Sequence, residues 1–186
     1  YAFPVNTWGG RLSYGYYKDK TAIKKGSLAS LKITGESEAQ IVSLRQPTYV
    51  SSIVQLDVVG GGKQRRNTNW IDKVFLSKTE TDDVSLGLEA QLLDQHSSWF
   101  AAYNRYFGRS RVADVRDNYI IDRGALRHNR DLGRGYSLRG TVSWQSTHKT
   151  LLPSGEQFLI GGEGSVRGHP IGTYAGDTGQ FVNLEW

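Results

Sequence analysis

Cysteine is absent from the sequence, and long apolar runs are missing. The 186 residues include no cysteine and only four prolines. Without cysteine, disulfide bonds, thiolate metal ligands and a cysteine nucleophile are all excluded. No stretch approaches the roughly 18 apolar residues of a membrane-spanning helix, and the mean hydropathy is -0.48. Insertion into a membrane as helices is therefore excluded.

A large excess of one charge is also missing. Lysine and arginine total 23 against 18 for aspartate and glutamate, which gives a formal net charge of +5. This mild basic excess permits contact with anionic lipid or nucleic acid without requiring either. Arginines recur between Arg105 and Arg139, but the aromatic residues of a recognised nucleic-acid module do not accompany them. We expect no nucleic-acid partner, because a polar lumen or rim explains these arginines more simply.

Glycine and aromatic residues are plentiful, and apolar residues alternate with polar ones. The chain has 22 glycines, ten tyrosines and five tryptophans, a composition that favours β structure. In "YSLRGTVSWQS" the apolar or small residues are Leu138, Gly140, Val142 and Trp144, and polar residues lie between them. The segments "TWGGRLSYGYYK" and "DVSLGLEAQLLD" follow the same rule. Such alternation predicts strands with one apolar and one polar face.

The alternation predicts eight strands. They are expected at residues 7–18, 35–46, 50–60, 70–93, 99–107, 118–130, 136–146 and 179–186. The connections alternate between short segments at 45–50, 94–99 and 131–136 and longer ones at 19–34, 61–69, 108–117 and 147–178. Short turns at one rim and long loops at the other are typical of an outer-membrane barrel. The expected fold is all-β, with antiparallel strands of a transmembrane β-barrel.

A soluble up-and-down barrel, such as a lipocalin, would show the same alternation because it buries its apolar face. Polar residues in the middle of strands favour the membrane barrel, since an arginine facing lipid at mid-depth costs about 2–4 kcal/mol. We expect these residues to face a watery lumen: Arg11, Glu89, Gln91 and Arg139. The terminal Trp186 suits either a closing barrel strand or an aromatic belt at the membrane surface.

The stretch "LLPSGEQFLIGGEGSVRGHPIGTYAGDTGQ" carries a specific motif. It resembles the two-partner-secretion outer-membrane transporters (the TpsB family), which export haemolysins, adhesins and contact-dependent toxins. In that family a loop after the eleventh strand folds into the lumen and carries Val-Arg-Gly-aromatic, preceded by Gly-Gly and followed by Gly-Asp-x-Gly. The matching residues here are Gly161, Gly162, Val166, Arg167, Gly168, Gly176, Asp177 and Gly179, with His169 at the aromatic position.

The resemblance implies an organisation for the chain. Residues 1–186 would be one partial barrel domain holding the fifth to twelfth of about sixteen strands, a size within the range of such barrels. Residues 147–178 would be the inward-folding loop, and POTRA domains would be absent. The family's arginine pairs with an acidic residue on the inner wall, typically on the thirteenth strand. The partner of Arg167 is then expected beyond Trp186, or at Asp177 if the loop doubles back.

The resemblance also implies a function. The chain would belong to a translocation pore in the outer membrane of a Gram-negative cell, with a secreted exoprotein as transient client and no enzymatic activity. Two alternatives stay open. A barrel-assembly insertase of the same superfamily would share the loop motif, although "EQF" and "WQST" favour secretion. A small closed outer-membrane barrel with a structural or passive-pore role would need no inward loop.

The sequence offers little sign of a metal site or of catalytic residues. The histidines, His96, His128, His148 and His169, lack metal-ligand spacing, so we expect no metal and no cofactor. The acidic pairs Asp82–Asp83 and Glu36/Glu38 are interpreted as solvated loop charges and not as a general acid and base, so no catalytic residue is assigned.

The basic segment "GGGKQRR" lacks the spacing of a phosphate-binding loop. We expect Lys63, Arg65 and Arg66 instead to contact lipopolysaccharide phosphates at the outer rim. Lipopolysaccharide and outer-membrane lipid are therefore the expected surroundings of the barrel.

A membrane barrel and a soluble barrel differ in their behaviour in detergent. We expect the full-length protein to migrate faster in a dodecyl-sulfate gel when unheated than when boiled, because closed membrane barrels resist unfolding by the detergent. Densitometry of paired heated and unheated samples measures this shift, with a lipocalin as control. Identical migration of both samples would contradict the membrane assignment.

Overall fold

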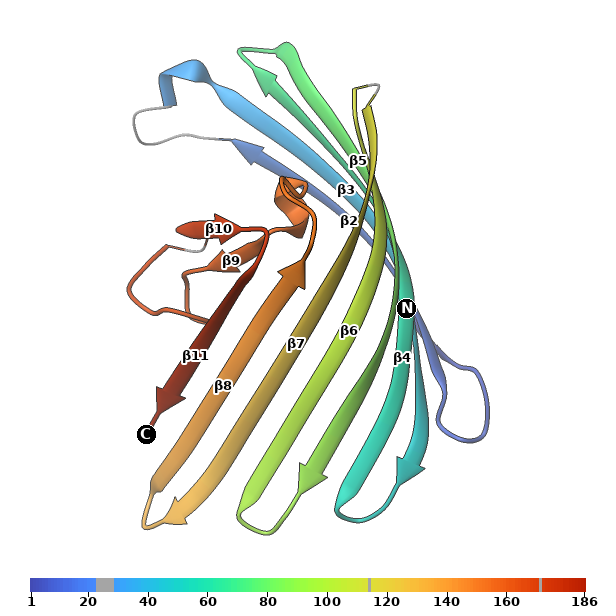
Figure 1. Cartoon of the computed structure of the whole chain (residues 1–186), viewed down its shortest axis with the longest axis vertical. Helices are drawn as coiled ribbons and strands as arrows, with labels where there is room; N and C mark the ends of the chain where they lie inside the picture. Colours follow the sequence, from blue (N-terminus) through green and yellow to red (C-terminus); the bar gives the residue numbers. More distant parts are fainter. Residues whose placement is uncertain (23–28, 114, 171) are drawn as a thin grey trace.

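The chain forms one broad, curved antiparallel sheet (Figure 1). This computed structural model describes residues 1–22, 29–113, 115–170 and 172–186. In spatial order the sheet consists of β1 (Ala2–Pro4), β2 (Arg11–Ala22), β3 (Ile33–Val50), β4 (Val54–Ile71), β5 (Val74–Leu93), β6 (Ser97–Val112), β7 (Val115–Gly133), β8 (Tyr136–Thr147) and β11 (Gly179–Glu185). Within the described ranges, no helix has the length and hydropathy needed to cross a membrane.

The remaining elements are short. Two 3-10 turns, η1 (Ala29–Leu31) and η2 (Ser154–Glu156), lie in connections between strands. A separate two-stranded hairpin pairs β9 (Phe158–Ile160) with β10 (Tyr174–Gly176). In Figure 1 this hairpin and η2 lie within the hollow of the curved sheet. The hairpin and η2, which belong to the connection between β8 and β11, therefore lie on the concave side.

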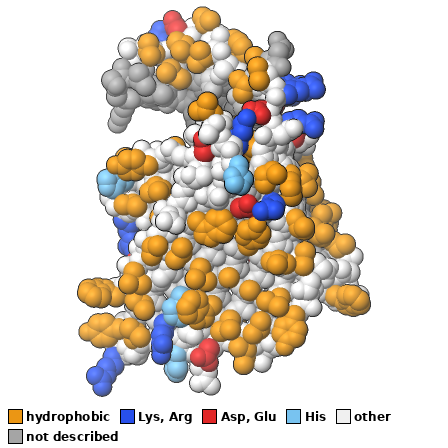
Figure 2. Space-filling view, viewed as in Figure 1, with side chains coloured by type: hydrophobic (Ala, Val, Ile, Leu, Met, Phe, Trp, Pro, Cys, Tyr) orange, Lys and Arg blue, Asp and Glu red, His pale blue; other side chains and the backbone are white. Residues whose placement is uncertain are grey.

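The convex face of the sheet is apolar. On β5 the side chains of Val84, Leu86 and Leu88 are 61–63% exposed, and hydrophobic side chains cover much of the face in Figure 2. Among the described residues the buried hydrophobic ones are only Ala39, Tyr119, Ile121 and Leu152. A soluble barrel would bury its apolar face, so the lipocalin-like alternative is wrong.

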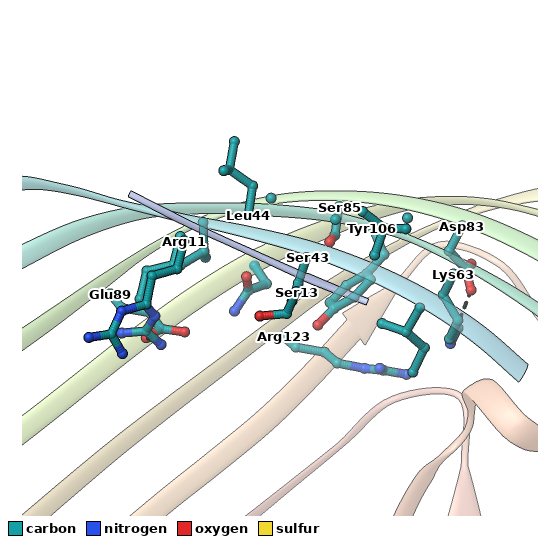
Figure 3. Close-up of a pocket in the computed structure, with 18 of the residues that line it drawn as sticks. Arg11, Ser13, Ser43, Leu44, Lys63, Asp83, Ser85, Glu89, Tyr106 and Arg123 are labelled. Carbon is teal, nitrogen blue, oxygen red and sulfur yellow. Dashed lines mark hydrogen bonds and ion pairs between the residues drawn. The ribbon is translucent and has the colours of Figure 1, made fainter. Parts of the chain in front are cut away.

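The concave face is polar, because successive side chains of a strand point to opposite sides of the sheet. Figure 3 shows Leu44 pointing to one side while Ser43 and Arg11 point to the other, into the hollow. A cavity of about 620 Å³ follows this wall, lined among others by Lys63, Asp83 and Arg123. This polar wall is the one expected of a lumen.

Eight long strands were expected and are present, but several of their ends were misplaced. The predicted loop at 61–69 lies within β4, and most of the predicted loop at 108–117 belongs to β6 and β7. The β4–β5 turn is instead made by Asp72 and Lys73, both at positive φ. Charged composition suggested loops there, but the strands continue past the apolar band and expose charged residues on both faces.

The opposite rim also differs in one place. The segment "RQPTYV" at 45–50, predicted as a turn, belongs to β3, and the turn to β4 comes at residues 51–53. The register shifts between Pro47 and Tyr49. This bulge accommodates Pro47, which has no N–H to donate to the neighbouring strand.

The sheet is open in the described part of the chain. Its order runs from β1 to β11, and these two strands do not pair with each other. β11 pairs along its length with β8, from Gly179 opposite Gln145 to Glu185 opposite Arg139. A self-closed barrel of eight strands is therefore not what the chain forms.

The two faces of β5 should respond oppositely to charge. Leu88→Arg places a guanidinium against lipid and should cost about 2–4 kcal/mol of barrel stability, whereas Ser85→Arg points into the polar cavity and should cost much less. The heat-modifiable fraction of the full-length protein in outer-membrane preparations measures the difference. Equal losses in both variants would contradict the assignment of the faces.

Candidate functional site

The inward loop, residues 148–178, rests on the concave wall through its first part. We call Lys149–Gln157 the loop root. The loop is described except for residue 171, and it leaves the sheet at the end of β8 and returns at the start of β11. Residues far apart in the chain, on β4 and on the loop root, are brought into direct contact.

Glu156, at the end of η2, is the centre of this contact. Its side chain is 1% exposed, and its carboxylate lies 2.5 Å from Lys63 Nζ, 3.4 Å from Arg123 Nη2 and 4.0 Å from Arg65 Nη1. Lys63 is also 3.0 Å from a carboxylate oxygen of Asp83 on β5, the pair drawn in Figure 3. One buried loop carboxylate therefore meets basic side chains from two strands of the wall.

Hydrogen bonds to the backbone of the loop root add to the ion pairs. Arg123 Nη2 donates to the carbonyl of Glu156 at 3.0 Å, and Arg65 Nη1 donates to that of Gly155 at 3.1 Å. Gln145 Nε2 donates to the carbonyls of Glu156 and Asp177, each at 2.9 Å. These contacts satisfy backbone carbonyls of the loop root and of Asp177.

Arg123 itself is held in place by its neighbours. Its Nε donates to Gln145 Oε1 at 2.7 Å, and its guanidinium lies 4.8 Å from the centroid of the Tyr106 ring. Tyr119 donates its hydroxyl to Asp83, which orders the acid that also faces Lys63. The wall is thus ordered by its own side chains where Glu156 docks.

Apolar packing and Asp177 complete the anchor. Leu152 is 5% exposed and belongs to a cluster with Tyr119 and Ile121. The carboxylate of Asp177 accepts hydrogen bonds from the amides of Leu151 at 2.7 Å and Leu152 at 2.9 Å. Asp177, expected from the motif just before the last strand, therefore fixes the beginning of the loop to its end.

Arg167 lies near the far end of the loop and makes a different contact. Its side chain is 61% exposed and forms an ion pair with Glu185 on β11, which also accepts from Asn183 Nδ2 at 2.9 Å. The carboxylate raises the pKa of Arg167 above its ordinary value. In the structure Glu185, and not the substitute Asp177, is the carboxylate paired with Arg167, and the expected partner beyond Trp186 lies outside the described residues.

The glycines of the motif shape a tight turn beside Arg167. Gly161 has φ of 123° and its missing Cβ would collide with the carbonyl of Pro170. Ser165 Oγ accepts from the amide of Gly161 at 2.7 Å and donates to its carbonyl at 3.0 Å. The amide of Gly162 donates to the carbonyl of His169 at 2.9 Å. These contacts close residues 161–169 into a compact tip.

The other motif residues occupy simpler positions. Val166 and His169 are exposed, Gly168 has φ of 86°, and Gly176 ends β10. Gly179 begins β11 and leaves room for the ring of Phe158, which a Cβ would strike. The glycines thus allow the loop backbone to pass close to its neighbours.

The residues predicted to face the lumen lie on the concave side. Arg11 and Glu89 line the cavity, and Glu89 forms an ion pair with Arg45, whose Nη1 also lies 2.7 Å from Asp57. Gln91 follows Glu89 on the same face of β5, since the two are two residues apart. Separately, Arg139 Nε donates to Asn129 Oδ1 at 3.2 Å on the inner face of β8.

Two interpretations of charged residues were wrong. Lys63 and Arg65 contact the loop root and not an outer rim, because odd-numbered positions of β4 face inward. Of the three basic residues in this segment only Arg66 points outward, and its Nε lies 3.1 Å from Glu80. Asp83 is a buried wall residue and not a solvated loop charge. Among the described residues no group of three acidic or histidine side chains could hold a metal.

Sequence reasoning missed the anchor at Glu156. The residue stands in "PSGEQF", which the motif comparison used only as context. A usable signal was present: Lys63 and Arg65 are two residues apart in β4, so they occupy one face. Basic residues on the polar face of a strand require an acidic partner nearby, and Glu156 is the acid of the loop root.

Comparison with known proteins agrees with this geometry. The family described as haemolysin secretion/activation protein ShlB/FhaC/HecB matches residues 1–185. CdiB from Acinetobacter baumannii is a similar solved structure, with a TM-score of 0.70 and 18% identity over 94% of this chain and 33% of that chain. The chain thus spans about a third of the length of that solved protein, and the likeness concerns the fold. No curated protein matches the sequence.

Removing the charge of Glu156 should release the loop root. Glu156→Gln leaves Lys63 and Arg123 without their carboxylate, and breaking a buried ion pair typically costs about 3–5 kcal/mol. Trypsin treatment of the folded full-length protein, followed by mass spectrometry, should show faster cleavage after Lys149 or Arg167. The control is Glu163→Gln, an exposed acid of the same loop. Equal cleavage rates in the two variants would contradict the anchor.

Proposed function

Because the chain belongs to the haemolysin secretion/activation protein family ShlB/FhaC/HecB, we propose that it forms part of an outer-membrane pore that exports a partner exoprotein. The observation that carries the proposal is that the loop of residues 148–178 docks inside an open half barrel. The concave face of this half barrel is polar, and its convex face is apolar. Residues 1–186 supply one partial barrel domain in this proposal, and the remaining strands and the POTRA domains come from outside them.

The polar wall suits passage of an unfolded chain. Charged and hydroxyl-bearing side chains line the cavity together with a few apolar ones, and they include Arg11, Ser13 and Ser43 near the start of β2 and the middle of β3. Such a wall is wetted by water and offers hydrogen bonds without binding any one sequence tightly. An extended exoprotein can therefore slide along it with its backbone solvated.

The inward loop occupies the path and must yield for export. Its root is held by a buried carboxylate, whereas its tip is held by the exposed pair of Arg167 and Glu185. Exposed ion pairs contribute about 0.2–1 kcal/mol, and breaking a buried one costs about 3–5 kcal/mol. We therefore assign the movement to the tip, around Gly161 and Gly162, while Glu156 keeps the root fixed.

The exposed tip residues carry the gating role in this proposal. Arg167 latches the tip to β11, Gly168 permits the turn, and Val166 and His169 are exposed at the tip. The family match favours export over the insertase activity of the wider superfamily. The open sheet disfavours a small closed barrel. No catalytic step is assigned to any residue.

The proposed surroundings are the outer membrane of a Gram-negative cell. The apolar convex face would meet lipid, and the charged strand ends above it would meet lipopolysaccharide. On that outward surface Arg66 and Lys78 both approach Glu80, at 3.1 and 2.8 Å. A mixed charged surface of this kind suits the hydrated headgroup region and not hydrocarbon.

Breaking and restoring the latch tests the function. In the full-length transporter, Arg167→Ala should lower export of the exoprotein, because a tip without its latch has no defined position from which to open for the client. Export is measured by immunoblot of the culture medium, and heat-modifiable migration should stay unchanged. Arg167→Lys should restore export only in part, because an ammonium lacks the planar fork of a guanidinium.

The charge-swapped pair Arg167→Glu with Glu185→Arg should export more than either single variant. Unchanged export in Arg167→Ala would contradict the proposed gating role. Absence of export by the unaltered transporter, with its partner exoprotein present, would contradict the proposed function itself.

A further inference from the structure

Three arginines gather on the convex face at the end of the β6–β7 hairpin. Arg109 and Arg111 belong to β6, and Arg116 of β7 is the direct cross-strand partner of Arg111. Arg109 and Arg111 follow Phe107 at steps of two residues on β6, and Arg116 precedes Ile120 by four residues on β7. All five side chains therefore point outward. The export pathway on the concave side does not use this surface.

The arginines stand immediately beyond the apolar band. Phe107 and Ile120 are cross-strand partners, 50% and 51% exposed. The next outward pair toward the hairpin tip is Arg109 with Asn118, and the pair after that is Arg111 with Arg116. The change from hydrocarbon-compatible to charged side chains therefore occurs within one step along each strand.

Arg105, one outward position below Phe107, shows how a guanidinium within the band is neutralised. Its Nε and Nη2 donate to the two carboxylate oxygens of Asp122 at 2.7 and 3.0 Å. Tyr103 donates its hydroxyl to the same carboxylate at 2.6 Å. At the level of the lipid tails the chain thus supplies Arg105 with a bidentate carboxylate partner, Asp122.

Among the described residues, the three arginines above the band have no such bidentate carboxylate partner. Arg109 Nε donates to Asn118 Oδ1 at 3.4 Å. Arg111 lies 3.6 Å from Glu80, an acid already shared with two other basic side chains. Asp82 stands opposite Arg109 on β5, but no described carboxylate lies within ion-pair distance of Arg109 or Arg116.

The described cations on the outward face of β2 are balanced by acids on β3. Lys18 on β2 lies 2.9 Å from Glu36 and 2.6 Å from Glu38 on β3, and Lys20 lies 3.7 Å from Glu36. The charge on β2 and β3 is therefore neutralised within the protein. Among the described residues, the outward face of β6 and β7 above the band differs from that of β2 and β3 in carrying a surplus of positive charge.

This arrangement fits a bound phosphate. Like charges directly opposite each other on neighbouring strands destabilise a sheet, and their Cβ atoms are about 4.5–5.5 Å apart. An anion between Arg111 and Arg116 removes this repulsion, and guanidinium groups bind phosphate oxygens in bidentate fashion. Arg109, two residues away on the same face, reaches the same anion from below.

We propose that Arg109, Arg111 and Arg116 form a site for the phosphate of a membrane lipid headgroup, with the acyl chains lying along Phe107 and Ile120. The identity of the lipid rests on the proposed function, which places this end of the strands at the outer leaflet. The ligand is then the phosphorylated glucosamine headgroup of lipid A. Bound there, it fixes the height of the hairpin in the membrane.

Binding of purified lipid A tests the site. Full-length transporter in detergent is mixed with bis-phosphorylated lipid A, and native mass spectrometry measures the lipid-bound fraction over a concentration series. The variant R109Q/R111Q/R116Q should bind at least about fivefold more weakly, the contribution of a single basic residue near a charged membrane surface. The matched control K18Q/K20Q, which removes balanced cations from the same face, should bind like the unaltered protein.

The outcomes separate specific from general attraction. Lipid A without phosphates should bind all three proteins equally weakly. Equal binding of lipid A by the triple variant and the unaltered protein would overturn the site, and so would an equal loss in K18Q/K20Q. Should the triple variant lose heat-modifiable migration, the single variant Arg116→Gln decides, with about fivefold weaker binding expected.

Export is measured separately in the same cells, so that the two proposals can fail independently. A triple variant that binds lipid A weakly but still exports supports the lipid site. Phosphate-dependent binding by a transporter that exports nothing would leave the lipid site standing and refute the exporter.

Discussion

A buried carboxylate on a loop, facing basic side chains on a wall, is the contact on which the arrangement of this molecule depends. Glu156 is 1% exposed and lies 2.5 Å from Lys63. A buried carboxylate without partners would be strongly destabilising, so the loop root docks where β4 and β7 supply cations. The Leu152 contact and the Asp177 hydrogen bonds then hold the two ends of the loop together. The lumen-directed loop is therefore held at its root by a buried carboxylate and at its tip by the exposed pair of Arg167 and Glu185.

The second constraint is the solvent on each side of the sheet. Strands in a membrane must pair all of their backbone groups and alternate apolar with polar side chains. The convex side chains of β5 are apolar and suit contact with lipid, whereas the concave side chains line a hydrated cavity of about 620 Å³. Where the strands rise beyond the band, the convex face becomes charged, as at Arg66 and Glu80. The same strands therefore present apolar side chains to lipid, polar side chains to the lumen and charged side chains to the outer surface.

Local pattern was sufficient to predict the strands and their two faces, whereas the inward loop was implied by the resemblance to the transporter family. The alternation around Leu88 and Leu138 is a property of neighbouring residues, so it can be read without a structure. The strand ends were harder, because Lys63 to Arg66 and Arg109 to Arg116 resemble loop composition but extend the strands. Pro47 was predicted to lie in a turn, but it lies within β3, where a bulge accommodates it. Glu156 was missed because its partner Lys63 lies 93 residues away in the chain, a distance that no local pattern spans.

The claim that Glu156 anchors the inward loop is tested most directly by a double-mutant cycle with Lys63. Unfolding of the full-length protein by guanidinium in lipid vesicles gives the stability of Lys63→Gln, Glu156→Gln and the double variant. Direct contact predicts a coupling free energy of about 1–3 kcal/mol, as residues in one ion-pair network show. Effects of the two substitutions that add to within about 0.5 kcal/mol would mean that the loop root does not rest on the wall.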